Sequence, residues 1–202
     1  MRVKSGQFSV EFMIVIAFLL IGLATITLPM YNRSSADAQR ASDLSDAREA
    51  ASTLANALNT VYADGIGSKQ TIEYWLPKGV AAVYADVDID GVDTDNDSIS
   101  DNPPRNGHLD VQIWFDLNGD NKPDSGNREA VVLVETIMPS KWNENGVLRQ
   151  NWENECPKVE DENFKLNSIH RTLHQVTITY TYRPGYSQPR RIAIIDNIIE
   201  VI

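Results

Sequence analysis

Two acidic loops carry the strongest chemical signal in the sequence. In each loop, carboxylate or amide side chains occupy every second position, and a further carboxylate follows four residues after the third of them. The first loop contains Asp93, Asp95, Asp97 and Asp101, and the second contains Asp116, Asn118, Asp120 and Asp124. Alternate side chains of a turning backbone converge, and oxygen ligands suit a hard divalent cation. The spacing therefore predicts that the chain binds one or two Ca2+ ions.

Both loops resemble the Asp-x-Asp-x-Asp calcium loops of EF-hand, dockerin and thrombospondin type 3 sequences, and the resemblance is limited to the loop itself. It implies that Ile99 and Lys122 lend backbone carbonyl ligands. The loops depart from the pattern where Ser98 and Asn121 replace the preferred glycine, and where Pro104 and Asn127 replace the acidic residue that closes the loop. We therefore expect modest affinity for calcium.

Two alternatives for the acidic loops stay open. Asp86, Asp88 and Asp90 precede the first loop, and they could supply missing ligands or shift its register. Acidic turns rich in Asn and Gly also solvate the ends of hairpins without binding any metal. The spacing alone does not separate these alternatives from a calcium site.

Other chemical signals are weaker. His170 and His174 are four residues apart, but the surrounding sequence is typical of the approach to a strand, so we do not expect a metal site there. Asn32 and Asn96 each begin a glycosylation sequon, a short and unspecific triplet. No nucleophile, base and orienting residue combine into a convincing set, and we expect a protein that is not an enzyme.

The amino-terminal segment combines charge, a small-residue junction and an apolar run. A polar leader with Arg2 and Lys4 precedes Glu11, and no charge interrupts the run from Phe12 to Leu28. A secretory signal peptide would have small residues after the apolar core, whereas Pro29 and bulky residues follow here. An ordinary membrane anchor has the required length but leaves the carboxylate of Glu11 unexplained, since an unpaired charge is costly in lipid.

The residues from Lys4 to Phe12, Lys-Ser-Gly-Gln-Phe-Ser-Val-Glu-Phe, resemble the class III signal peptide of archaeal type IV pilins, whose pattern is Gln-x-Ser-x-Glu followed by Tyr or Phe. The resemblance covers about a tenth of the chain. It implies that a prepilin peptidase cleaves between Gly6 and Gln7. Glu11 would then be the fifth residue of the mature chain, and it would pair with the Gln7 amine of a neighbouring subunit.

The composition limits the remaining functional classes. The chain has 202 residues, enough for one anchor helix and one globular domain. With 18 basic and 28 acidic residues its net charge is -10, which argues against nucleic acid as a partner. Cys156 is the single cysteine, so no disulfide can form within the chain, and we expect its thiol to be buried or incidental.

Hydrophobic periodicity predicts one long helix over residues 7–64, apolar to about residue 31. Pro29 is expected to kink this helix. Beyond it, apolar residues recur at steps of three and four and predict one buried face. These residues are Leu44, Ala47, Ala51, Leu54, Leu58 and Val61. Gly65 and Gly67 are expected to end the helix, because glycine tolerates the left-handed conformation found at helix termini.

After the helix the hydrophobic period becomes two, which is typical of strands. We expect strands at residues 71–76, 80–87, 109–115, 130–137, 175–183 and 191–202. Strict alternation from Leu109 to Phe115 predicts one buried face there. The polar interval from Pro139 to Ser168 is expected to be a loop or an irregular hairpin. It is also a place to look for a contact surface.

These patterns predict an α+β fold in which a long amino-terminal helix carries a head with an antiparallel sheet or sandwich. The expected organisation is a cleaved leader at 1–6, a helix at 7–64 and an extracellular head at 65–202. The resemblance implies a pilus subunit that lies in the membrane before it polymerises with copies of itself on the archaeal cell surface. Adhesion is an expected role. The alternative is a membrane-anchored surface binding module that never polymerises.

Overall fold

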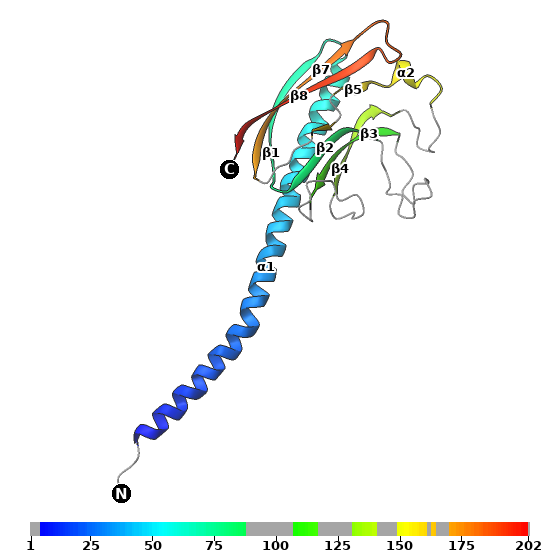
Figure 1. Cartoon of the computed structure of the whole chain (residues 1–202). Helices are drawn as coiled ribbons and strands as arrows, with labels where there is room; N and C mark the ends of the chain where they lie inside the picture. The colour runs from blue at the N-terminus through cyan, green and yellow to red at the C-terminus, as the bar shows by residue number, and fades with distance from the viewer. Residues whose placement is uncertain are drawn as a thin grey trace. The chain divides into compact units, whose positions relative to one another are not determined.

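A computed structural model describes residues 5–87, 107–116, 131–140, 149–160, 163–164 and 170–201, with the side chains of 5–9, 11, 86, 87, 163 and 164 outside the description. The chain divides into two compact units, Met1–Ser42 and Asp43–Ile202. Figure 1 gives the order of the elements along the chain. We describe each unit by itself.

Helix α1 extends over Ser5–Asp64, so it begins two residues before the predicted start and ends at the predicted residue. Pro29 lies inside the helix and does not end it. Gly65 and Gly67 follow with φ angles of 86° and 98°, which confirms their predicted role. The Ser68 hydroxyl donates a hydrogen bond to the Val61 carbonyl at 2.6 Å, and this bond satisfies one of the carbonyls left free at the helix end.

The second unit contains two four-stranded sheets. One sheet has the order β1-β7-β8-β5, with bounds Lys69–Leu76, Thr172–Tyr182, Arg190–Val201 and Lys158–Glu160. The other has the order β4-β3-β2-β6, with bounds Val131–Pro139, His108–Phe115, Val80–Val87 and Asn163–Phe164. All described pairings are antiparallel except β5 with β8, which is parallel. The predicted α+β class is confirmed, as a long helix followed by mixed sheets.

The predicted strands all have counterparts, and the polar interval from Pro139 to Ser168 holds more structure than expected. Helix α2, Trp152–Glu155, and strands β5 and β6 lie within it. The prediction of a loop or irregular hairpin is therefore wrong for these segments. Elements of four, three and two residues are too short to display a hydrophobic period, so the sequence contains no signal for them.

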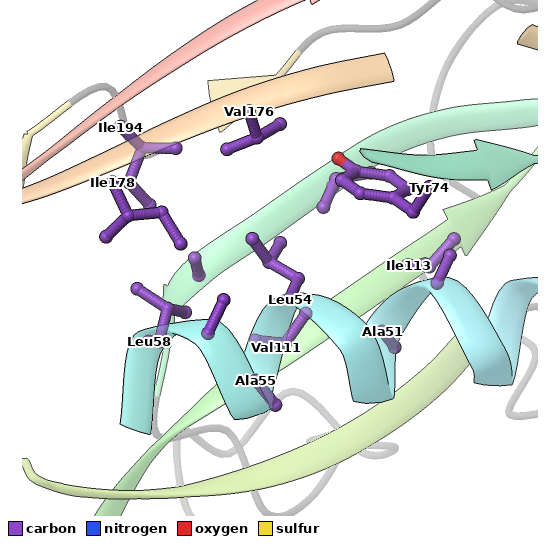
Figure 2. Packing of buried hydrophobic residues seen from close by; sticks show 14 of the residues in the cluster. Ala51, Leu54, Ala55, Leu58, Tyr74, Val111, Ile113, Val176, Ile178 and Ile194 are labelled. Carbon is purple, nitrogen blue, oxygen red and sulfur yellow. The ribbon is translucent and has the colours of Figure 1, made fainter. Parts of the chain in front are cut away.

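The end of α1 packs with both sheets in one hydrophobic core (Figure 2). Five of the six predicted stripe residues are buried, and Leu44 is the exception at 40% exposed. Ala50, Ala55 and Ala57 are also buried, so the buried face is wider than the predicted stripe. A wide face is expected where one helix meets two sheets. Burying a single leucine contributes about 1.5–3 kcal/mol, which makes this face the main link between α1 and the strands.

Strand β3 is buried on both faces. Leu109, Val111, Ile113 and Phe115 lie on the predicted core face and are at most 6% exposed. The opposite face carries Asp110 and Gln112, which are 2% and 1% exposed. The prediction of a single buried face is therefore incomplete, because strict alternation of polar and apolar residues normally marks a strand with one side in water.

Candidate functional site

The first candidate site is the apolar part of α1. Its large apolar side chains from Val10 to Tyr31 are between 40% and 72% exposed. Exposed apolar surface of this extent marks a membrane or protein contact. Among the described residues, α1 is the one helix that is long and apolar enough to cross a membrane. The exposed apolar surface of this segment and its length both suit a membrane-spanning helix.

The polar side chains within this apolar run are satisfied inside the helix. The Thr25 hydroxyl donates to the Gly22 carbonyl at 2.8 Å, and the Thr27 hydroxyl donates to the Leu23 carbonyl. Such bonds remove the cost of placing a hydroxyl in hydrocarbon, where no water can replace the partner. The run can therefore enter lipid without leaving these two donors unpaired.

The predicted processing and assembly residues lie at the start of α1. The backbones of Gly6, Gln7 and Glu11 belong to the helix, and the side chains of Gln7 and Glu11 lie outside the description. Four helical residues rise about 6 Å, so positions 7 and 11 are about one turn apart on one face. This spacing places the predicted amine and carboxylate close to the same end of the apolar run. Asn32 of the first sequon is exposed on α1, and Asn96 of the second lies outside the described residues.

Most of the predicted calcium ligands lie outside the described residues. They are Asp93, Asp95, Asp97, Ile99, Asp101, Asn118, Asp120, Lys122 and Asp124. Asp116 directly follows β3, and its backbone N–H donates to the Gly79 carbonyl at 2.8 Å. Within the part of the chain that is described, no three His, Cys, Asp or Glu residues gather as a metal site.

The described strands show where the connections that contain the predicted calcium ligands join the sheet. Residues 88–107 join the end of β2 to the start of β3, where Val87 pairs with Asp110. Residues 116–130 join the end of β3 to the start of β4, where Trp114 pairs with Val131. The two connections therefore leave β3 at opposite ends. A strand of eight residues is about 23 Å long, and this is the separation of the two points at which the connections join β3.

A buried polar cluster is the second candidate site. His174 on β7 is 0% exposed, and its Nδ1 lies 2.8 Å from Oδ2 of Asp196 on β8. Its Nε2 lies 2.8 Å from the Thr172 hydroxyl oxygen. The Tyr74 ring on β1 stacks against the imidazole with a centroid separation of 5.7 Å. Side chains from three adjacent strands therefore meet at one histidine.

Burial controls the ionisation of two groups around the sheets. Burial and the nearby carboxylate of Asp196 raise the pKa of Tyr74 well above its ordinary range, so its hydroxyl stays neutral. Burial is also the main cause that raises the pKa of the Cys156 thiol. This thiol is 3% exposed and donates to the Ser140 carbonyl at 3.1 Å. The prediction of a buried cysteine is confirmed, and a protonated, buried thiol is a poor nucleophile.

Thr172, His174 and Asp196 have the order of a nucleophile, a base and an orienting carboxylate. The hydroxyl and the imidazole are nevertheless enclosed, with Thr172 5% and His174 0% exposed. A substrate cannot reach either group in this conformation. The arrangement instead satisfies the polar atoms of a buried histidine, which would be costly without partners.

The sequence pattern relates His174 only to His170, four residues earlier. His170 is exposed and precedes β7, whereas His174 is fully buried and both of its ring nitrogens already have partners, Thr172 and Asp196. The two histidines therefore do not form one site. The partner that matters, Asp196, is 22 positions away, and only the pairing of β7 with β8 brings it close.

No known protein family, curated protein or solved structure matched this chain.

Proposed function

We propose that this chain is a structural subunit of an archaeal type IV-like pilus, which polymerises through the apolar part of α1 and displays the β-rich unit outside the cell. The change of environment along α1 is the observation that carries the proposal. Described side chains up to Ser42 are exposed, whereas Leu54, Leu58 and others near the helix end are buried in the head core. A helix with its own folded head and a separate exposed apolar segment has the parts that such a subunit requires.

The apolar segment supports two consecutive environments. Its length and composition suit a membrane, and its exposed aliphatic side chains also suit packing against the same segment of other copies. The Gly6-Gln7 junction and Glu11 favour assembly over simple anchoring. In the proposed mechanism, a prepilin peptidase exposes the Gln7 amine, and Glu11 pairs with this amine of an adjacent subunit. The pair offsets the cost of a carboxylate in the apolar bundle.

The alternative is a membrane-anchored surface module that does not polymerise. It would use the same apolar helix, so the membrane-spanning property does not separate the two functions. Shearing surface filaments from cells that produce the chain does separate them. A pilus subunit is expected in the sheared fraction with a mature terminus at Gln7, as read by mass spectrometry. A chain that stays in the membrane fraction would favour the anchored module.

Glu11 provides the sharper test of assembly. Glu11→Ala should stop or slow filament formation while cleavage and head folding continue, because the amine of the neighbour would lose its partner. Asp37→Ala is a matched control, because it removes an acid from an exposed position of α1 beyond the apolar run. Filaments of normal yield from the Glu11 variant would contradict the proposed role.

Calcium binding by the acidic loops and adhesion through the head are parts of the proposed function. The spacing of the loop ligands supports the first part, and ions bound there would fix the segments that connect β3 to β2 and to β4. The head has no disulfide that could serve this purpose, since Cys156 is the only cysteine.

A further inference from the structure

In the sheet β1-β7-β8-β5, two strand edges have no pairing partner among the described residues. The outer edge of β1, Lys69–Leu76, is one of them. The other is the part of β8 beyond Ala193, because β5 pairs with β8 only at residues 191–193. Free strand edges present unpaired N–H and C=O groups and are suited to strand addition.

The two free edges lie at the same level of the sheet. Strand β7 lies between them, and its pairings connect Thr71 through Thr177 to Ile195. In the same way Glu73 is level with Asn197, and Trp75 is level with Glu200. Lys69, the first residue of β1, is level with Ala193, where β5 ends. Strand β5 therefore covers β8 up to the level at which β1 begins and leaves the remainder open.

Strand direction favours a second copy in the same orientation. Strands β1 and β8 are both antiparallel to β7, so they run in the same direction. If two copies with the same orientation stand side by side, the free edge of β8 in one meets β1 of the next as a parallel pair. A filament whose subunits all point one way uses such head-to-tail contacts rather than two-fold symmetric ones.

Polar groups along the two edges also match. Glu73 on β1 is level with Asn197 on β8, so pairing of β8 with β1 would set the Glu73 carboxylate against the amide of Asn197.

The side chains along the two edges are complementary. Apolar side chains on the open part of β8 are more than half exposed, and they are Ile195, Ile198, Ile199 and Val201. On β1, Trp75 offers an apolar ring at the level of Glu200. The guanidinium of Arg171 lies 5.3 Å from the centre of that ring and pairs with Asp46 at 3.1 Å. Glu200 of a neighbouring copy would meet apolar surface and this cation together.

We propose that the open edge of β8 in one subunit adds to the outer edge of β1 in the next, so that the sheet continues from head to head. The partner is a second copy of this chain. The inference rests on the proposed function, because it requires copies that share one orientation. It adds a contact between heads to the contact between apolar helices.

Cysteine cross-linking in filaments tests this contact. In Glu73→Cys/Asn197→Cys, the two positions within one copy are separated by two strand spacings, about 10 Å, which exceeds the limit of about 7 Å for a disulfide. Both native residues are exposed, and the native Cys156 is buried. Oxidised filaments of this variant should give a ladder of linked chains on a non-reducing gel.

Three control variants separate the proposed contact from general proximity. Each single variant, Glu73→Cys or Asn197→Cys, should remain largely monomeric on the gel. Glu135→Cys/Asn197→Cys places one thiol at an exposed position of β4, in the other sheet, and this variant should give no ladder. Filaments of the test pair that form normally and give no ladder overturn the inference and leave the pilus proposal standing. Absence of filaments from the unaltered chain overturns the pilus proposal itself.

If the cysteine variant does not assemble, hydrogen exchange on the unaltered chain tests the contact between β8 and β1. Amides of residues 69–76 and 194–201 should exchange more slowly in filaments than in detergent-solubilised subunits. Residues 131–139 of β4 serve as the reference and should change much less. Equal exchange of both edges in the two samples overturns the inference.

Discussion

The two parts of α1 contain similar residues in opposite environments. Leu19 is 58% exposed, whereas Leu54 is 1% exposed in the same helix. The exposed part satisfies its threonine hydroxyls within the helix, and the buried part relies on side chains from two sheets. One continuous helix therefore has two segments in different environments. Its first part is exposed and apolar enough to cross a membrane, and its second part packs into the core of the head.

Two histidine–carboxylate pairs repeat this contrast within the head. His174 pairs with Asp196 at 2.8 Å, and His108 pairs with Glu135 at 2.9 Å. The side chains of the first pair are 0% and 9% exposed, and those of the second are 39% and 56% exposed. The distances are almost equal, so the environment decides how much each pair contributes to stability.

The largest expected effect is the loss of the buried histidine. His174→Ala should lower the free energy of unfolding of the head by about 3–5 kcal/mol, because it leaves the Asp196 carboxylate, whose side chain is 9% exposed, and the buried Thr172 hydroxyl without their partner. His108→Ala is the matched control and should cost about 0–1 kcal/mol. Denaturant unfolding of the detergent-solubilised chain measures both. Equal losses in the two variants would show that burial does not govern these pairs.

A leucine comparison tests α1 directly. Leu54→Ala should cost the head about 2–5 kcal/mol, because it removes buried methyl groups and leaves a cavity. Leu19→Ala should change head stability by less than about 0.5 kcal/mol, because the side chain is outside the head core. The same unfolding measurement applies. Similar losses from both substitutions would contradict the division of α1 into two environments.

A charge in the exposed part of α1 should impair membrane insertion and leave the stability of the head unchanged. Leu20→Asp should oppose membrane insertion by about 2.5–3.5 kcal/mol, since a carboxylate is costly at the centre of a membrane helix. Head unfolding should remain unchanged. The fraction of chain in carbonate-washed membranes measures the first effect, and Leu20→Phe is the control that keeps the position apolar. Full insertion of the aspartate variant would argue against a membrane-spanning segment.

Calcium should act on the head and not on the apolar helix. Saturation a hundredfold above Kd would stabilise the folded head by about 2.7 kcal/mol. The melting temperature should therefore be several degrees higher with calcium than with chelator. Asp93→Ala/Asp97→Ala should remove the part of this stabilisation that comes from the first loop. Asp116→Ala/Asp120→Ala should remove the part that comes from the second loop. Magnesium should replace calcium poorly, because it requires a tighter octahedral shell. No heat of binding at millimolar calcium, together with an unchanged melting temperature, would identify the loops as solvated turns.

The smallest expected effect concerns the contact between α1 and β4. The side-chain oxygen of Asn59 accepts a hydrogen bond from the backbone N–H of Ile137 at 2.8 Å. Asn59→Ala should cost about 0.5–1.5 kcal/mol, the usual value for one such bond. Asn56→Ala, at an exposed position one turn earlier, is the control and should be nearly neutral. A loss no greater than that of the control would indicate that the bond does not stabilise the edge of the sheet.

Long periodic segments were predictable from the sequence, and contacts between distant segments were not. The helix end at Asp64 and the six longer strands follow from glycine positions and from hydrophobic periods of 3.6 and 2. The parallel strand β5 depends on pairing with β8, and its three residues have no period of their own. Asn59 illustrates the same limit, since it lies outside the predicted apolar stripe and its side-chain oxygen nevertheless accepts a hydrogen bond from the edge strand β4.

The candidate sites also divide into contiguous motifs, which the sequence shows, and contacts between distant segments, which it does not. The junction at Gly6 and Gln7 and the acidic loops are contiguous motifs, so they were visible in the sequence and stay predictions. The cluster of His174, Asp196 and Tyr74 was missed because its members come from three strands. The exposed edge of β8 was also missed, because an apolar strand sequence does not reveal which of its sides lacks a neighbour.

The alanines of the buried part of α1 constrain how this protein can change over evolutionary time. Ala47, Ala50, Ala51, Ala55 and Ala57 are at most 2% exposed, so a larger side chain at any of them would need space that the packed core does not provide. The apolar run from Phe12 to Leu28 keeps its apolar character when leucine, isoleucine and phenylalanine exchange. We therefore expect relatives of this chain to vary more in residue size within this run than at the five buried alanines.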